Sequence, residues 1–103
     1  MTVPVITHPE AEEDIRQARA WYDDISPVLG EDFVGCVLES LELIGRHPGL
    51  YAGVGGGLRR AFVRRFPYHV YYRIGTAFVG VLAVCHSHSD RRRLLRQAAR
   101  RVF

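Results

Sequence analysis

His86 and His88 are the residues of this sequence whose type and spacing best suit acid–base or metal chemistry. They flank Ser87, and a spacing of two places both side chains on one face of a β-strand. Two neighbouring imidazoles can transfer protons in an RNA-cleaving site, or bind a metal together with a carboxylate such as Asp90. A metal would need further ligands, so we expect no metal site. Histidines at a strand end are more often surface or partly packed residues, so we assign His86 and His88 a catalytic role only for a nuclease.

Arginines interleaved with aromatic residues form a second candidate site. The segment Arg59–Asp90 is rich in strand-forming residues and contains paired arginines. Alternation along two of its expected strands places six side chains on one open face, namely Arg60, Phe62, Arg64, His69, Tyr71 and Arg73. Such a face can bind nucleic acid, because arginine neutralises phosphate and aromatic rings stack on bases. It suits an acidic, partly hydrophobic protein segment equally well, and it can also be a solvated basic face with no partner.

The charge is divided unevenly along the chain. Residues 1–50 contain three arginines and ten acidic residues, whereas residues 51–103 contain eleven arginines and one acidic residue. This asymmetry suggests an anionic partner for the second half. All the basic residues are arginine, whose guanidinium stays charged and makes forked contacts to phosphate or carboxylate. Genome composition explains the absence of lysine equally well.

Length and composition suit one domain spanning residues 1–103. Apolar residues make up 48% of the chain, which allows a modest core and argues against wholesale disorder. No apolar run approaches the roughly 20 residues of a membrane helix, and the first residues lack the pattern of a signal peptide. We therefore expect a cytoplasmic protein with no membrane partner and no cofactor. We expect Cys36 and Cys85 to be small buried side chains, because two cysteines make no disulfide framework.

The first half of the chain predicts a strand and two helices. Val3–Ile6 is short and β-branched, as in a strand, and Thr7 is the expected N-cap of the helix that follows. Apolar residues then recur at helical spacing as far as Ser26, where Pro27 begins a second helix. The second helix ends before His47. The short connection predicts an antiparallel helical hairpin.

The second half predicts a sheet. Glycine-rich residues 51–57 are expected to form a mobile loop, because glycine holds regular structure weakly. Strands are expected at about 58–66, 68–74 and 78–87, and their short links favour antiparallel pairing. On the middle strand, Tyr68, Val70, Tyr72 and Ile74 should face the helices. Residues 91–103 form a basic tail, either a short amphipathic helix capped by Asp90 or a disordered segment. The predicted class is therefore α+β, in the order β-α-α-β-β-β, with the hairpin on one face of a mainly antiparallel sheet.

The chain resembles the RelE/ParE superfamily of bacterial type II toxins, and its ParE-like branch above all. The similar segments read HPEAEEDI, WYDDISPVLGEDF and LRRAFVRRFPYHVYYRI, and the resemblance extends to about Asp90. It implies a toxin, often concerned with plasmid stabilization, that a cognate antitoxin neutralises. ParE-like members inhibit DNA gyrase, whereas RelE-like members cut messenger RNA on the ribosome. A homodimer or a heterotetramer with the antitoxin would fit this class.

Matching individual positions favours the gyrase branch. The nuclease branch has an arginine at the position where this chain has His69. It has a second arginine at the end of the last strand, where the corresponding position in this chain is about Ser87. No tyrosine follows Tyr72, so a catalytic tyrosine in the tail has no counterpart. His86 and His88 keep a ribosome-dependent endoribonuclease as the alternative. A further alternative is a non-toxic module that only binds its partner.

Overall fold

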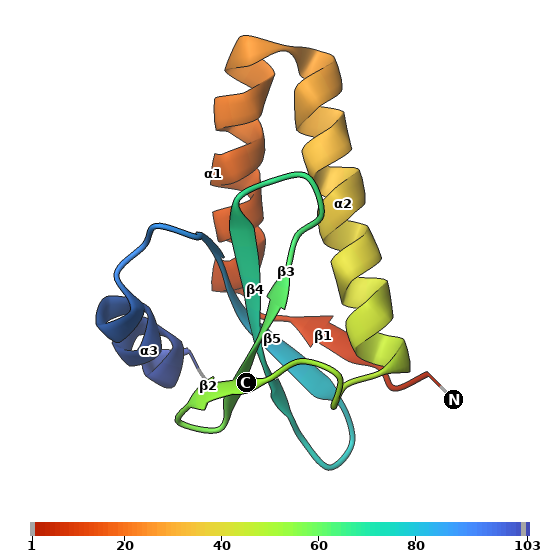
Figure 1. Ribbon diagram of the computed structural model, residues 1–103, viewed down its shortest axis with the longest axis vertical. Coiled ribbons are helices and arrows are strands. Elements are labelled where there is room, and N and C mark those ends of the chain that lie inside the picture. The colour runs from red at the N-terminus through yellow and green to blue at the C-terminus, as the bar shows by residue number, and fades with distance from the viewer. Residues whose placement is uncertain (1, 102) are drawn as a thin grey trace.

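The computed structural model describes residues 2–101 and residue 103, and it has an α+β fold (Figure 1). A helical hairpin covers one face of a five-stranded sheet, and a short C-terminal helix lies on the other face. The elements in chain order are β1 (Val5–Thr7), α1 (Pro9–Ile25), α2 (Pro27–Arg46), β2 (Gly53–Gly55), β3 (Leu58–Phe62), β4 (Tyr68–Ile74), β5 (Val79–His86) and α3 (Arg91–Arg100). The predicted fold class is confirmed.

The start of α1 differs from the prediction by one residue. His8, not Thr7, is the N-cap: its backbone is extended, and its Nδ1 accepts a hydrogen bond from the N–H of Glu10 at 3.1 Å. Thr7 instead ends β1, where it pairs with Val81. Pro9 then fits the first turn because it lacks an N–H that would need a partner.

The sheet is mainly antiparallel, as predicted. Its strand order is β1-β5-β4-β3-β2; β1 pairs with β5 in parallel, and the other three described pairings are antiparallel. The hairpin makes the connection between the first strand and the rest of the sheet (Figure 1). Between β4 and β5 the register shifts, because Tyr71 pairs with Ala83 while Tyr72 pairs with Val81. Leu82 is therefore an extra residue in β5, as in a β-bulge.

The glycine-rich segment is more regular than predicted. We expected residues 51–57 to be a mobile loop, but Gly53–Gly55 forms the edge strand β2 on β3. Two features of Val54 explain why this segment forms a regular strand. Its side chain is buried, and its carbonyl accepts a hydrogen bond from Arg91. Positive φ values at Gly55, Gly56 and Gly57 make the turn into β3, a conformation that glycine adopts without steric cost.

The two faces of the sheet have separate cores. The larger core joins the hairpin to the sheet through packed aromatic rings; its rings are those of Tyr22, Phe33, Phe66 and Tyr68. The smaller core lies under α3, where Leu94 and Ala98 cover Leu82 and Ala83. Asp90 caps α3, accepting hydrogen bonds from the N–H groups of Arg92 and Arg93, so the helical reading of the tail is confirmed.

Candidate partner-binding surface

Four of the six predicted surface residues lie together on the α3 side of β3 and β4. In the strand register Arg60 is opposite Tyr71, and Phe62 is opposite His69. The Arg60 guanidinium carbon lies 5.6 Å from the centroid of the Phe62 ring, in cation–π geometry. The Phe62 ring in turn meets the His69 ring edge-on, with centroids 4.9 Å apart. We call Arg60, Phe62, His69 and Tyr71 the Arg60 cluster.

The members of the Arg60 cluster differ in exposure. Phe62 is 58% exposed, whereas Tyr71 is only 4% exposed because it belongs to the small core under α3. The expectation that Tyr71 stands on an open face is therefore wrong, since the tail folds over that part of the sheet. Burial lowers the pKa of His69 below its usual value, and the charges of Arg60 and His86 lower it further.

Arg64 lies on the opposite side from the one predicted. The expected strand 58–66 ends at Phe62, so strand alternation does not reach Arg64. In the turn that follows, Arg65 has a positive φ of 71°. Arg64 reaches α2, where its Nε and Nη2 donate to the Glu39 carboxylate at 3.0 and 3.2 Å. Both side chains are exposed, so this forked pair adds little to stability.

Arg73 lies at the far end of β4 from His69 and Phe62. Its Nη2 donates to the carbonyl of Gly56 at 2.9 Å, which ties β4 to the turn after β2. The six predicted residues therefore do not form one continuous surface. Arg60, Phe62 and His69 remain accessible together, while Arg64 and Arg73 flank the sheet in different directions.

His86 and His88 do come together, but not as predicted. We expected both on one face of a strand ending at residue 87, but β5 ends at His86 and His88 lies in the turn. Their rings stack with centroids 5.2 Å apart, and the His86 Nδ1 accepts the N–H of His88 at 3.1 Å. Among the residues that the structure describes, no group of three or more His, Cys, Asp or Glu side chains could hold a metal.

Two grooves border the hairpin, and the sequence reading missed both. One, of about 520 Å³, runs between α1 and the end of β5 and is lined in part by Trp21, Tyr68 and His86. The other, of about 500 Å³, lies between α2 and the sheet; its lining includes Leu43, Phe62 and Arg64. Trp21 is 61% exposed. In the sequence, Trp21 lies beside the apolar stripe of α1 and not on it, which could have indicated an exposed aromatic residue at this groove.

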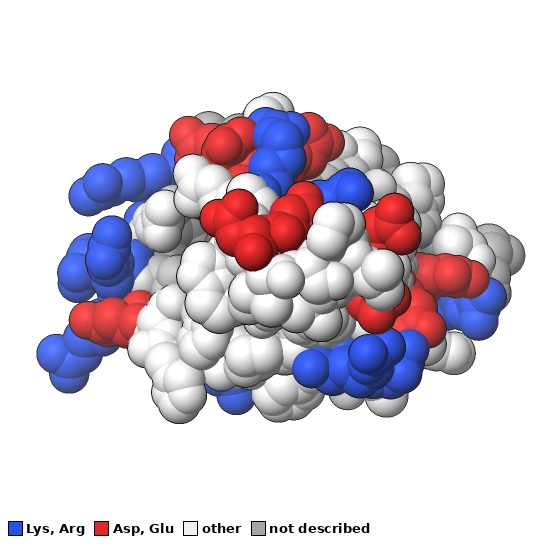
Figure 2. All heavy atoms as spheres, turned by 90° about the horizontal axis from the view of Figure 1, so that it is seen from above, with Lys and Arg blue, Asp and Glu red and all other residues white. Residues whose placement is uncertain are grey.

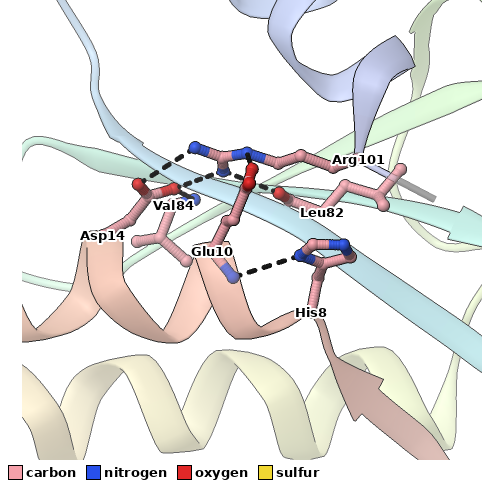
Figure 3. Close-up of polar contacts among 6 residues, drawn as sticks. All are labelled: His8, Glu10, Asp14, Leu82, Val84 and Arg101. Carbon is pink, nitrogen blue, oxygen red and sulfur yellow. Dashed lines mark hydrogen bonds and ion pairs between the residues drawn. The ribbon is translucent and has the colours of Figure 1, made fainter. Parts of the chain in front are cut away.

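A buried ion pair was also missed. The Arg101 side chain is only 5% exposed. Its Nη1 donates to Asp14 Oδ2 at 2.7 Å, and its Nη2 donates to Asp14 Oδ1 at 3.3 Å (Figure 3). Nη1 also donates to the carbonyl of Leu82 at 2.8 Å. Arg101 Nε lies 2.8 Å from Glu10 Oε2 as an ion pair, but its direction does not suit a hydrogen bond to any described residue. Asp14 Oδ2 also accepts the N–H of Val84.

Both cysteines are free, and neither is fully exposed. Burial raises the pKa of the Cys85 thiol to about 12, with Asp14 raising it further and Arg101 opposing this.

The residues that the structure describes contain no helix long and apolar enough to span a membrane.

The order of elements and the hairpin on a mixed sheet define a toxin fold of the ParDE type. Residues 5–91 match the family described as the ParE toxin of type II toxin–antitoxin systems, parDE, and the chain belongs to this family. A solved structure titled "Chromosomal ParDE TA system from P. aeruginosa" is similar, with a TM-score of 0.74 and 17% identity over 82% of this chain and 96% of that chain. No curated protein matches the sequence significantly. Membership of a toxin–antitoxin family implies a cognate antitoxin as partner.

Proposed function

We propose that this protein is a cytoplasmic toxin that inhibits DNA gyrase and is neutralised by its cognate antitoxin. The observation that carries the proposal is the match of residues 5–91 to the ParE family. The protein acts in this account without chemistry of its own.

The Arg60 cluster and the adjoining α2 groove form the proposed antitoxin surface. Phe62 belongs to both, because its ring meets the His69 ring edge-on and it also lines the groove. Its exposed ring is a candidate anchor for an apolar side chain, since exposed aromatic residues dominate many interfaces. Arg60 lies over the Phe62 ring and favours an acidic segment on that side. Arg64 lines the same groove as Phe62 but is paired there with Glu39. Tyr71 joins this surface only if α3 moves, and Arg73 contributes only at its rim.

The antitoxin surface is tested by measuring binding of the co-expressed antitoxin to single variants. Phe62→Ala should weaken binding at least tenfold, a typical loss for an aromatic anchor at an interface centre, about 1.4 kcal/mol or more. Leu50→Ala is the control, because Leu50 is similarly exposed and lies outside the cluster and the groove. Equal effects of the two changes would refute the assignment. Size measurement of the purified complex decides between a 1:1 complex and a heterotetramer.

The choice of target is tested by induced expression in a bacterium, following DNA and protein synthesis by pulse labelling. Gyrase inhibition predicts that DNA synthesis stops first and that cells form filaments. Collapse of protein synthesis within minutes would contradict it and would favour a ribosome-dependent endoribonuclease using His86 or His88. Normal growth with folded protein present would indicate a non-toxic partner-binding module instead.

A further inference from the structure

Four arginines of α3 differ from the other arginines of the chain in their side-chain contacts within the described residues. Ten of the fourteen arginines contact an acidic group, a backbone carbonyl or an aromatic ring. Among the residues that the structure describes, the remaining four have no such contact; they are Arg92, Arg93, Arg96 and Arg100. We call them the α3 arginine face.

Helical geometry gathers these four side chains on one side. Leu94 and Ala98 are the buried residues of α3 and point into the sheet. At 3.6 residues per turn, Arg96 falls opposite them, with Arg92 and Arg100 one turn away on either side. Arg93, Arg96 and Arg100 line a shallow hollow of about 370 Å³ together with Gln97. In Figure 2, basic side chains project furthest from the body on the side where α3 lies.

The helix that carries this face is fixed at both ends. Asp90 caps its first turn, and Arg91 donates to the Val54 carbonyl of β2. Its C-cap, Arg101, is held in the buried contact with Asp14 and Leu82. The arginines are therefore presented on a docked element, which lowers the entropy that a ligand must remove on binding.

The placement of charge in α3 opposes the helix dipole. The N-terminus of a helix carries partial positive charge, yet Arg91, Arg92 and Arg93 occupy the first turn of α3. Asp90, the N-cap, is acidic, but the sequence of α3 itself contains no acidic residue. A bound anion would relieve the repulsion. The four residues of the α3 arginine face lie beyond the part of the chain that matches the family, which ends at residue 91.

We propose that the α3 arginine face binds the phosphate backbone of double-stranded DNA without reading its sequence. Arg92, Arg96 and Arg100 follow one another in steps of about 6 Å along the helix axis, close to the spacing of about two phosphates along a strand at about 3.4 Å each. The exposed face has no aromatic side chain for stacking on unpaired bases. It also lacks the apolar centre that a protein interface requires. This proposal is independent of the gyrase assignment.

The test measures binding of the full-length protein to a fluorescent duplex at several salt concentrations. If three phosphates are contacted, affinity should fall about 40-fold between about 50 and 200 mM salt. The α3 triple variant Arg92→Gln, Arg96→Gln and Arg100→Gln should lose at least tenfold affinity at the lowest salt, with a shallower salt dependence. Replacing the same three residues by lysine should keep most of the binding, because phosphate neutralisation depends on charge.

The matched control removes three arginines that have acidic partners on their own helices: Arg16→Gln, Arg19→Gln and Arg46→Gln. Its change in net charge is the same, so its affinity should stay within about twofold of the parent. Equal losses in both triple variants would mean general charge attraction and would overturn the proposal. No binding by the parent protein would also overturn it, as would equal losses in the lysine and glutamine variants. Displacement of the duplex by polyglutamate at equal charge concentration would assign the face to an acidic protein instead.

Discussion

Asp14 and Arg101, 87 positions apart in the sequence, form a two-point ion pair that caps the edge of β5. β1 covers this edge only as far as Val81. Beyond it, the Asp14 carboxylate accepts the N–H of Val84, and the Arg101 guanidinium donates to the carbonyl of Leu82 (Figure 3). Two side chains thus satisfy backbone groups that would otherwise need a neighbouring strand. The same pair fastens the tail to α1 and keeps α3 on the sheet.

Removing one partner of the Asp14–Arg101 ion pair should destabilise the protein strongly. Arg101→Ala leaves the partly buried Asp14 carboxylate and the Leu82 carbonyl without their donor, and should lower the free energy of unfolding by about 3 kcal/mol. The double variant Asp14→Leu with Arg101→Met should lose less, because neither charge then remains without its partner. Urea unfolding measures both.

The control for that experiment is Arg46→Ala, which removes an exposed ion pair within α2. Its expected cost is about 0.5 kcal/mol. A loss for Arg101→Ala no larger than this would show that the buried pair does not hold the tail in place.

Stability should depend on pH through His69. Its pKa is lowered in the folded protein, so folding favours the neutral imidazole. Unfolded histidine takes up its proton at a pH near 6.5. The contribution of His69 is therefore fully present above that pH and is lost as the pH falls through the folded pKa. His69→Gln should flatten the decline in unfolding free energy between about pH 7 and 5. His47→Gln, at an exposed position, is the control substitution. An unchanged profile in the His69 variant would contradict the prediction.

The Cys85 thiol should be unreactive in the folded protein. With its pKa raised to about 12, only a very small fraction is thiolate at neutral pH. In a Cys36→Ser background, the reaction with a thiol reagent at about pH 8 should be at least about 100-fold slower than in urea, since each pKa unit changes the thiolate fraction tenfold. Similar reaction rates for the folded and unfolded protein would contradict the conclusion that burial suppresses the reactivity of Cys85.

Toxicity should survive the loss of both candidate catalytic histidines. His86→Ala with His88→Ala removes a stacked pair near the protein surface, and the account predicts growth arrest as strong as that of the parent. Growth on induction measures this, with antitoxin binding as the control for folding. Loss of toxicity with antitoxin binding retained would favour the endoribonuclease alternative.

The local spacing of residues in the sequence predicted most of the fold, but only part of the candidate partner-binding surface. Apolar spacing and the Ser26–Pro27 stop were enough for the hairpin, because those signals are read within one or two turns. The order of β2 depends on contacts from Arg91 and Leu58 that lie outside the glycine-rich segment, so glycine content alone was misleading. Strand alternation failed at Arg64, where β3 had already ended.

The ion pair between Asp14 and Arg101 could not be predicted as a contact, because nothing local links positions so distant. One signal was present, since Asp14 falls on the same helical stripe as the buried Ala11 and Ala18. A carboxylate on a buried stripe requires a partner, and the eleven arginines of the second half were the candidates. Tyr71 was misplaced for a related reason, because its burial depends on where the tail docks.

The central claim is tested most directly with purified components: this protein, DNA gyrase and a relaxed plasmid with ATP. The account predicts that added toxin blocks supercoiling in proportion to its concentration, and that stoichiometric antitoxin restores it. The α3 triple variant should be assayed beside the parent, so that DNA binding by the toxin is separated from inhibition of the enzyme. Undiminished supercoiling in the presence of folded, antitoxin-competent toxin would contradict the claim.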